Sequence, residues 1–269
     1  MNPFAYDFFQ NALWGVVLTG LITGIIGTYI VTRRMVFIAG GITHSSFAGL
    51  GFGFMTGYNP LYFAFLAAIL SGLGVDLLSR KEAVRHDSAI AAVWSLGMAL
   101  GVLFVFMTPG YAPSLSAFLF GNILLVTTRD LLYLSLFLLV SIVLVLLHFK
   151  EFLYVSFDPE FARTKGLPVK RIEIRMMIWY CAGIVFSIRV MGIMMLMSML
   201  SLPQMTVGLF TSDFRKLLIG SSLLSVLVVV VSLFGAFYLN LPTGALSVVL
   251  LSVVFFMAKG VQALRSRRV

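Results

Sequence analysis

Cysteine and charged residues are both scarce in this sequence. Cys181 is the one cysteine among 269 residues, which excludes an internal disulfide framework and a cysteine-based metal cage; we interpret it as a small apolar filler in a helix. Charged residues make up 11% of the chain and hydrophobic residues 60%, whereas average globular proteins are about 25% charged. In water such a chain would expose large apolar patches. We therefore predict a multi-pass membrane protein, and the mean hydropathy of +1.05 agrees.

Sequence motifs of enzymes are missing as well. There is no G-x-x-x-x-G-K-[ST] loop, no nucleophile elbow and no H-E-x-x-H. No pair of acids lies at membrane depth. We therefore expect a chain that is not an enzyme and cannot hydrolyse ATP by itself. The first dozen residues lack the basic region of a cleavable signal peptide, so we expect the first apolar run to remain in the mature chain.

Apolar runs follow one another along the whole chain, and a helix needs about 20 such residues to cross a bilayer. The run 174–188 is short, and 115–126 is too short to cross alone. Asp87 and Asp130 are predicted to cap two of the helices. The sequence predicts an all-α polytopic transmembrane bundle of eight or nine spans in one membrane domain, residues 1–269. The spans are expected near 10–31, 36–57, 60–79, 89–108, 131–149, 174–188, 190–209, 216–238 and 243–260.

Basic residues are confined to alternate connections. With "TRR" at 32–34 inside, every lysine and arginine except Arg129 and Arg189 falls on the cytoplasmic side, while "GYNP", "TPGYAPS" and "NLPTG" carry no charge. Short cytoplasmic loops are enriched in Lys and Arg. We predict a protein of the inner membrane with its N-terminus outside and its C-terminus in the cytoplasm. Topology then accounts for the net charge of +9, and the lipid membrane, not nucleic acid, is the expected partner.

Ionisable residues within a span are costly and point to function, and His44 is the clearest case. Its neighbours Thr43 and Ser45 are polar too. Imidazole is a common ligand of first-row transition ions, so His44 is a candidate metal ligand, with Thr43 and Ser45 as candidates along an ion path. The alternative is a neutral histidine hydrogen-bonded to a neighbouring helix.

Three methionines, Met191, Met195 and Met199, recur every four residues on one helix face. Thioethers favour Cu(I), but methionine also fills irregular gaps in a packed interior. Met194 and Met197 lie on other faces of the same helix. We interpret the stripe as packing.

Small residues recur at four-residue spacing in the first two spans. In a membrane, small residues let helix backbones approach closely. We therefore expect the two segments to pack tightly against neighbouring helices or a second protomer. The candidate packing residues are Gly20, Gly24, Gly49, Gly53 and Gly57.

A polar segment, residues 155–170, separates two long apolar runs. In "FDPEFARTKGLPV", Asp158 can cap a short helix, Pro159 suits its first turn, and Glu160 suits its N-terminus. Gly166 ends the turn. We predict a cytoplasmic amphipathic knuckle that carries a partner's movement to the membrane helices; a solvated loop is the alternative.

Several stretches, in order along nearly the whole chain, are similar to the ABC-3 family of membrane permeases, which take up zinc, manganese or iron in bacteria. The stretch after the first span carries His44 at the family's histidine. The other stretches are the fourth-span signature, the segment containing "FGNIL", the coupling segment and two C-terminal signatures. They read "RRMVFIAGGITHSSFAGLGFGF", "RHDSAIAAVWSLGMALGVLF", "LSAFLFGNILLVTTRDL", "SFDPEFARTKGLPV", "VMGIMMLMSMLSLPQMT" and "YLNLPTGALSVVL".

The resemblance implies a permease of the type II importer kind, paired with a second protomer as a homodimer or with a related permease. It implies two cytoplasmic ATPase subunits that bind the ATP and an external solute-binding protein that delivers the ion. His44 would face the ion path. The chain itself would hold no cofactor, and the divalent metal would be its cargo. The ATPase contact would consist of Asp158, Pro159, Glu160, Ala162 and Gly166.

Two positions depart from the family's pattern. Gly40 stands where the family usually has an aspartate, one helical turn before His44, and Asn122 stands where it often has an acid. Asn122 keeps an oxygen ligand on the path without a charge. The rival functions are a permease for a metal chelate, siderophore- or cobalamin-like, and a membrane scaffold or sensor that transports nothing.

Overall fold

The computed structural model describes residues 3–80, 85–109, 121 and 123–266. The described chain is helical and contains no strand. The chain forms two compact units. Unit 1 comprises 1–32, 118–141 and 187–269, and unit 2 comprises 33–117 and 142–186. The helices are η1 (Pro3–Ala5), α1 (Asp7–Thr32), α2 (Val36–Thr56), α3 (Pro60–Arg80), α4 (His86–Phe106), η2 (Ile123–Leu125), α6 (Thr128–Phe157), α7 (Pro159–Thr164), α8 (Val169–Met199), α9 (Leu202–Gly208), α10 (Phe214–Leu239) and α11 (Thr243–Ser266).

Six helical segments of the described chain are long and apolar enough to cross a membrane. Within α3, the stretch Pro60–Val75 is apolar but shorter than these segments. The all-helical membrane fold is therefore confirmed, whereas the predicted count of eight or nine spans is not. The α2 helix, 21 residues long, is not among these segments. The six segments are Asp7–Thr32, Asp87–Phe106, Thr128–Phe157, Val169–Gly208, Phe214–Leu239 and Thr243–Arg265.

The break predicted between residues 188 and 190 is wrong. The α8 helix continues through Arg189, and its interruption lies at Gly192, where φ is 70° and ψ is 169°. Arg189 does not end the helix, because its guanidinium Nη1 pairs with Asp130 Oδ1 at 2.7 Å. Thr127 is the residue before α6, and its hydroxyl accepts from the amide of Asp130. Asp130, in the first turn, accepts in return from the amide and the hydroxyl of Thr127, so it completes a capping box instead of occupying the cap position itself.

The predicted cap of α4 is also wrong. The helix begins at His86, and the N-cap position belongs to Arg85, whose side chain makes no capping hydrogen bond. Asp87 lies inside the first turn. A carboxylate there still complements the positive end of the helix dipole, so the acid is at the helix start for an electrostatic reason.

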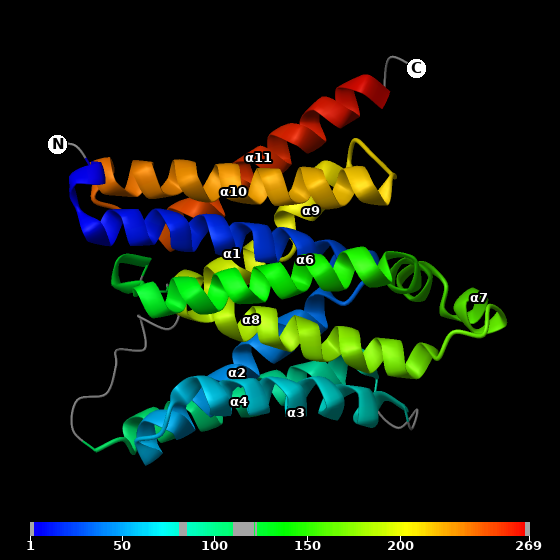
Figure 1. Cartoon of the computed structure of the whole chain (residues 1–269), viewed down its shortest axis with the longest axis horizontal. Coiled ribbons are helices and arrows are strands. Elements are labelled where there is room, and N and C mark those ends of the chain that lie inside the picture. Colours follow the sequence, from blue (N-terminus) through cyan, green and yellow to red (C-terminus); the bar gives the residue numbers. More distant parts are fainter. Residues whose placement is uncertain (1–2, 81–84, 110–120, 122, 267–269) are drawn as a thin grey trace. The chain divides into compact units, whose positions relative to one another are not determined.

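Close approach of α1 and α10 builds unit 1, and the two helices run side by side in Figure 1. A Cβ on Gly20 would lie 3.2 Å from Cα of Val226, and one on Gly24 would overlap Ser222. A Cβ on Gly27 would likewise overlap the side chain of the buried Gln204. The amide nitrogen of Gln204 donates a hydrogen bond to the carbonyl of Thr23 at 3.2 Å. The side-chain amide therefore adds a polar contact to a junction that also buries the hydroxyls of Thr19, Thr23 and Ser225.

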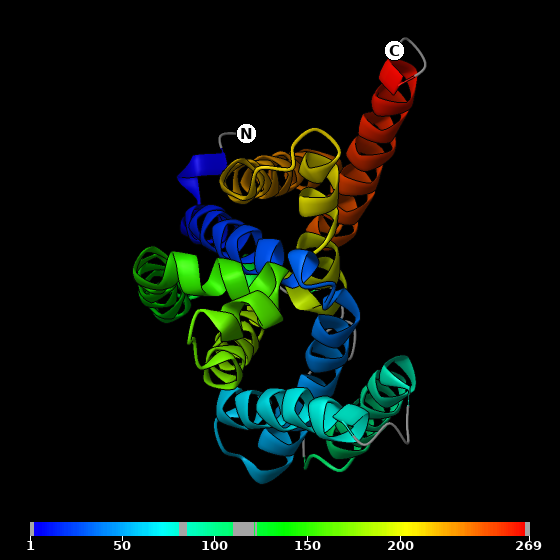
Figure 2. The ribbon, with the colours of Figure 1, turned by 90° about the vertical axis from the view of Figure 1, so that its right-hand side faces the viewer.

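Close approach of α2 to α3 and α4 builds part of unit 2 (Figure 1, Figure 2). A Cβ on Gly49 would overlap the carbonyl of Phe63 in α3, and one on Gly53 would lie 3.1 Å from Cβ of Pro60. Gly97 of α4 lies equally close to Ser45. Gly57 has a different place: it ends α2 with φ 74° and has open space around it.

Candidate functional site

The hydroxyl residues around His44 are turned back into their own helix. Thr43 donates to the carbonyl of Ala39, and Ser45 donates to that of Gly41, both at 2.7 Å. Both side chains are buried. His44 is half-buried and makes no such bond. Of the described ion-path candidates, His44 is the one that is not fully enclosed, so its imidazole is the group most accessible to a ligand.

Two residues of α4 hold the imidazole. The ring of Trp94 stacks on it with the centroids 4.2 Å apart and the planes 14° from parallel. Met98, one turn further along α4, places its Sδ 3.3 Å from Nδ1 of His44. The other ring nitrogen, Nε2, has no hydrogen-bond partner among the described residues. The spacing of Trp94 and Met98 puts both on one helix face, but nothing in the sequence pairs that face with His44.

No carboxylate joins this cluster from α2, because Gly40 occupies the position one turn before His44 and is buried. Asn122 lies outside the described residues. Across the described part of the chain, no three histidine, cysteine or acidic side chains come close enough to hold a metal ion. The site therefore offers nitrogen and sulfur atoms, and it suits brief contact with an ion in transit better than permanent retention.

The knuckle is a six-residue helix, α7, at the tip of the connection between α6 and α8 (Figure 1). Asp158 is its N-cap and accepts a hydrogen bond from the amide of Phe161 at 2.9 Å, and Pro159 occupies the first turn as predicted. Ala162 is fully buried. Gly166 adopts φ 75° and ends the helix with its amide bonded to the carbonyl of Arg163. A capped, sharply terminated helix of this kind has a defined shape.

The outer surface of α7 combines charge with aromatic rings. Glu160 pairs with Arg163, and the ammonium of Lys165 lies 5.4 Å from the ring centroid of Phe161. Phe157 and Phe161 are both exposed. Exposed rings and charged side chains thus lie next to one another on α7.

Three ion pairs lie within unit 2 near the connection that carries α7. Arg33 pairs with Glu173 at 2.6 Å, and Arg175 approaches Glu151 to 3.7 Å. His148, at a kink in α6, lies 3.2 Å from the same Glu151. Arg33 belongs to the first connection that the charge pattern assigns to the cytoplasm. The pairing brings that connection to the segment that follows the knuckle.

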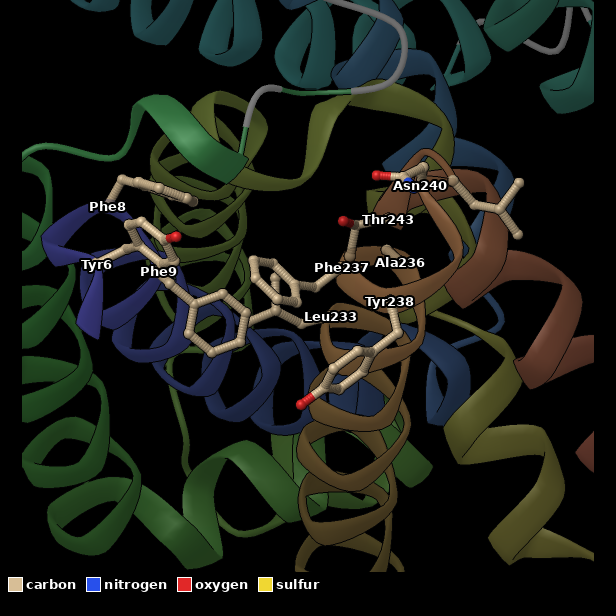
Figure 3. A pocket seen from close by; sticks show the side chains of 10 residues that line it. Tyr6, Phe8, Phe9, Leu233, Ala236, Phe237, Tyr238, Asn240 and Thr243 are labelled. Carbon is tan, nitrogen blue, oxygen red and sulfur yellow. The ribbon is translucent and has the colours of Figure 1, made fainter. Parts of the chain in front are cut away.

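A cavity of about 660 Å³ opens in unit 1 between the start of α1 and the end of α10. Figure 3 shows aromatic side chains around it, among them Tyr6, Phe8, Phe237 and Tyr238. No lining residue carries a charge. A site for a bare cation needs anionic or strong neutral donors, so the ion path is not assigned to this cavity.

The described chain is helical and has six apolar segments long enough to cross a membrane, which defines a multi-pass membrane protein. The model of the ABC 3 transport family matches residues 5–262. The chain belongs to this family and is a transport subunit, not an enzyme.

Relatives agree over nearly the whole chain. An uncharacterized membrane protein, slr2045, of Synechocystis is 33% identical over 253 residues, covering 94% of this chain and 90% of the relative. The manganese transport system membrane protein MntC of Listeria monocytogenes is 31% identical with the same coverage, 94% and 90%. The solved structure of PsaBC from Streptococcus pneumoniae in complex with Fab superposes with a TM-score of 0.87 at 24% identity, covering 94% of this chain and 91% of that chain. At that identity the structure establishes the fold.

Proposed function

We propose that this chain is the permease subunit of an ATP-driven importer that carries a divalent first-row transition-metal ion, zinc, manganese or iron, into the cytoplasm. The observation that carries the proposal is the family match across residues 5–262. The relative named as a manganese transport protein, similar over 94% of this chain, supports metal as the cargo class. His44 is then the point on the path where the ion meets the protein.

The orientation places the N-terminus outside and the C-terminus in the cytoplasm. Its support is the distribution of basic residues together with the Arg33–Glu173 pair. That pair joins two segments that the positive-inside rule assigns to the same side of the membrane.

The cytoplasmic ATPase subunits bind at α7. Residues Asp158, Pro159, Glu160, Ala162 and Gly166 set the shape of this helix, and its exposed aromatic rings supply the contact. ATP binds on the partner, so closure of the ATPase pair would move α7 and, through it, the ends of α6 and α8. The permease opens outward to receive the ion and inward to release it.

A second permease protomer and an external solute-binding protein complete the proposed assembly. One chain offers a histidine but no three-residue metal cluster among its described residues. A path that binds weakly is compatible with transport, because conduction requires that the ion can leave. The binding protein therefore supplies the affinity and the permease supplies the passage.

The test is metal accumulation, measured by elemental analysis in cells that carry the complete complex, with zinc, manganese and iron offered separately. His44→Ala is expected to abolish uptake of the cargo ion while the complex still assembles. His148→Ala is the matched control, since that histidine pairs with Glu151 in the segment assigned to the cytoplasm, and it should leave uptake unchanged. If the wild-type complex accumulates none of the three ions, a chelate permease or a non-transporting scaffold replaces this proposal.

A further inference from the structure

Resting on the proposed function, we propose that His44 and Met98 together form the selective point of the path. Their nitrogen and sulfur donors would favour a borderline-to-soft ion, Zn²⁺, over the hard Mn²⁺. Met98 is then a specificity-determining residue that contacts the cargo. The support lies in the contact geometry, in the kind of donors present and in the way the imidazole is held.

The spacing of the two donor atoms fits one shared ion. Nδ1 of His44 and Sδ of Met98 are 3.3 Å apart. With zinc–nitrogen bonds of about 2.0–2.1 Å and the zinc–thiolate bond of about 2.3 Å as the lower limit for a thioether, two ligands of one ion lie roughly 3 to 4 Å apart. An ion can therefore sit between the two side chains without separating α2 from α4.

The donor set selects the kind of ion. Imidazole suits zinc and the later transition metals, thioethers prefer soft ions, and manganese prefers carboxylate and water oxygens. The position one turn before His44 is Gly40, which has no side-chain donor. The hydroxyls of Thr43 and Ser45 are buried and bonded to carbonyls of their own helix. The donors that meet between α2 and α4 are a nitrogen and a sulfur, from which a hard ion gains little.

Trp94 restricts the imidazole to the orientation that this pairing needs. Its ring stacks on His44 with the planes 14° apart, so the imidazole is held in its own plane with Nδ1 toward Met98. The helices cannot drift apart easily, because Gly97 lies directly against Ser45 and Gly101 against Phe47. The pair is thus preorganised by packing.

The competing interpretation is purely structural: Nδ1–H donates a weak hydrogen bond to the thioether, and the pair never meets an ion. The two interpretations differ in one observable. A packing contact affects the amount of folded complex and the uptake of all ions alike, whereas a ligand changes the ratio in which two ions are carried.

The experiment compares zinc and manganese offered together to cells that carry the complete complex, with uptake read by elemental analysis and assembly by size-exclusion chromatography. Met98→Leu keeps the volume but removes the sulfur. We expect it to lower the zinc-to-manganese uptake ratio about tenfold, by analogy with the loss of groups that tune a metal site. Met107→Leu, at the exposed end of the same helix, should leave the ratio unchanged.

A second measurement does not depend on transport. X-ray absorption at the zinc edge of the purified, zinc-loaded complex should show a sulfur scatterer beyond the thiolate distance of about 2.3 Å in the wild type and none in Met98→Leu. An unchanged uptake ratio in Met98→Leu, or nitrogen and oxygen scatterers alone in the wild type, overturns the inference while leaving the importer intact. Absence of any metal uptake by the wild type overturns the proposed function itself, and the inference falls with it.

Discussion

Two glycine-lined junctions differ in what they enclose: α1 with α10 in unit 1, and α2 with α3 and α4 in unit 2. In unit 1, Gly24 and Gly27 admit Ser222 and Gln204, and the amide of Gln204 bonds to backbone carbonyls. In unit 2, the glycine contacts of α2 leave His44 half-buried beside Met98. In unit 1 the side-chain amide of Gln204 bonds to backbone carbonyls of the junction. In unit 2 the imidazole of His44 lies beside the sulfur of Met98.

The difference separates packing from function. Small residues permit close helix approach in both places, so the glycines alone mark neither as a site. What distinguishes the second junction is an imidazole whose neighbours are another side chain's sulfur and ring instead of backbone carbonyls. Glycines allow close helix packing in both junctions. The two junctions differ in the polar side chain that they enclose, which is Gln204 in unit 1 and His44 in unit 2.

The largest expected effect comes from filling either junction. In Gly49→Ala the new methyl would overlap the backbone carbonyl of Phe63, and in Gly24→Ala it would overlap Ser222. Overpacking costs about 1–3 kcal/mol, so both variants should leave less intact complex after heating in detergent. Gly260→Ala is the control, since a Cβ there meets no atom within 4 Å. Equal survival of all three variants would mean that the helices separate without cost.

Removing the buried side-chain amide of Gln204 in unit 1 should have the next largest effect on stability. Gln204 is 1% exposed and donates to Thr23, whereas the exposed Gln262 donates to Leu209 at 3.1 Å. Gln204→Ala leaves buried carbonyls with one donor fewer and is expected to cost roughly 1–3 kcal/mol. Gln262→Ala should have little effect because water replaces the bond. The thermal midpoint of the purified complex measures both, and a similar loss in the two variants would contradict the assignment of Gln204 to a buried junction.

A third comparison uses one helix cap from each unit. Asp158 caps the six-residue α7, and Asp213 caps the 26-residue α10. Asp158→Ala should cost α7 about 0.5–2 kcal/mol, enough to disorder a helix of that length and uncouple ATP hydrolysis from metal uptake. Asp213→Ala should leave coupling intact, because the rest of α10 is held by packing. The readout is the number of ions imported per ATP hydrolysed, and normal coupling in Asp158→Ala would exclude α7 as the transmission point.

The smallest effect concerns the pH dependence of the cap of α10. Hydrogen bonds from the amides of Lys216 and Arg215 lower the pKa of Asp213. A lowered pKa means that the carboxylate stabilises the fold above the unfolded-state pKa of about 3.9, and that this contribution is lost as the pH falls through the folded-state value. Wild type should therefore be slightly more stable than Asp213→Asn near neutral pH. The two thermal midpoints should converge in acid, and a gap that persists there would refute the electrostatic origin.

Local features of the sequence predicted local features of the fold. The apolar runs predicted the helices, and the order Asp158–Pro159 predicted the cap of α7 that the structure contains. The errors lie where distant residues meet. Arg189 suggested a break, but a carboxylate 59 positions earlier in the chain, Asp130, accepts its charge. Likewise His44 could be singled out by residue type, whereas its neighbour Met98, 54 residues away, becomes visible only when α2 packs on α4.

Gly192 gives α8 a change of direction that a regular helix of 31 residues lacks. Its backbone angles, φ 70° and ψ 169°, interrupt the ladder of hydrogen bonds that makes a helix stiff. Val190, Met191 and Ile193 around this point are at most 1% exposed, so the change of direction is fixed by tight packing. Glycine adopts a positive φ without the steric cost that a Cβ brings. A side chain at position 192 would therefore alter the angle between the two segments of α8.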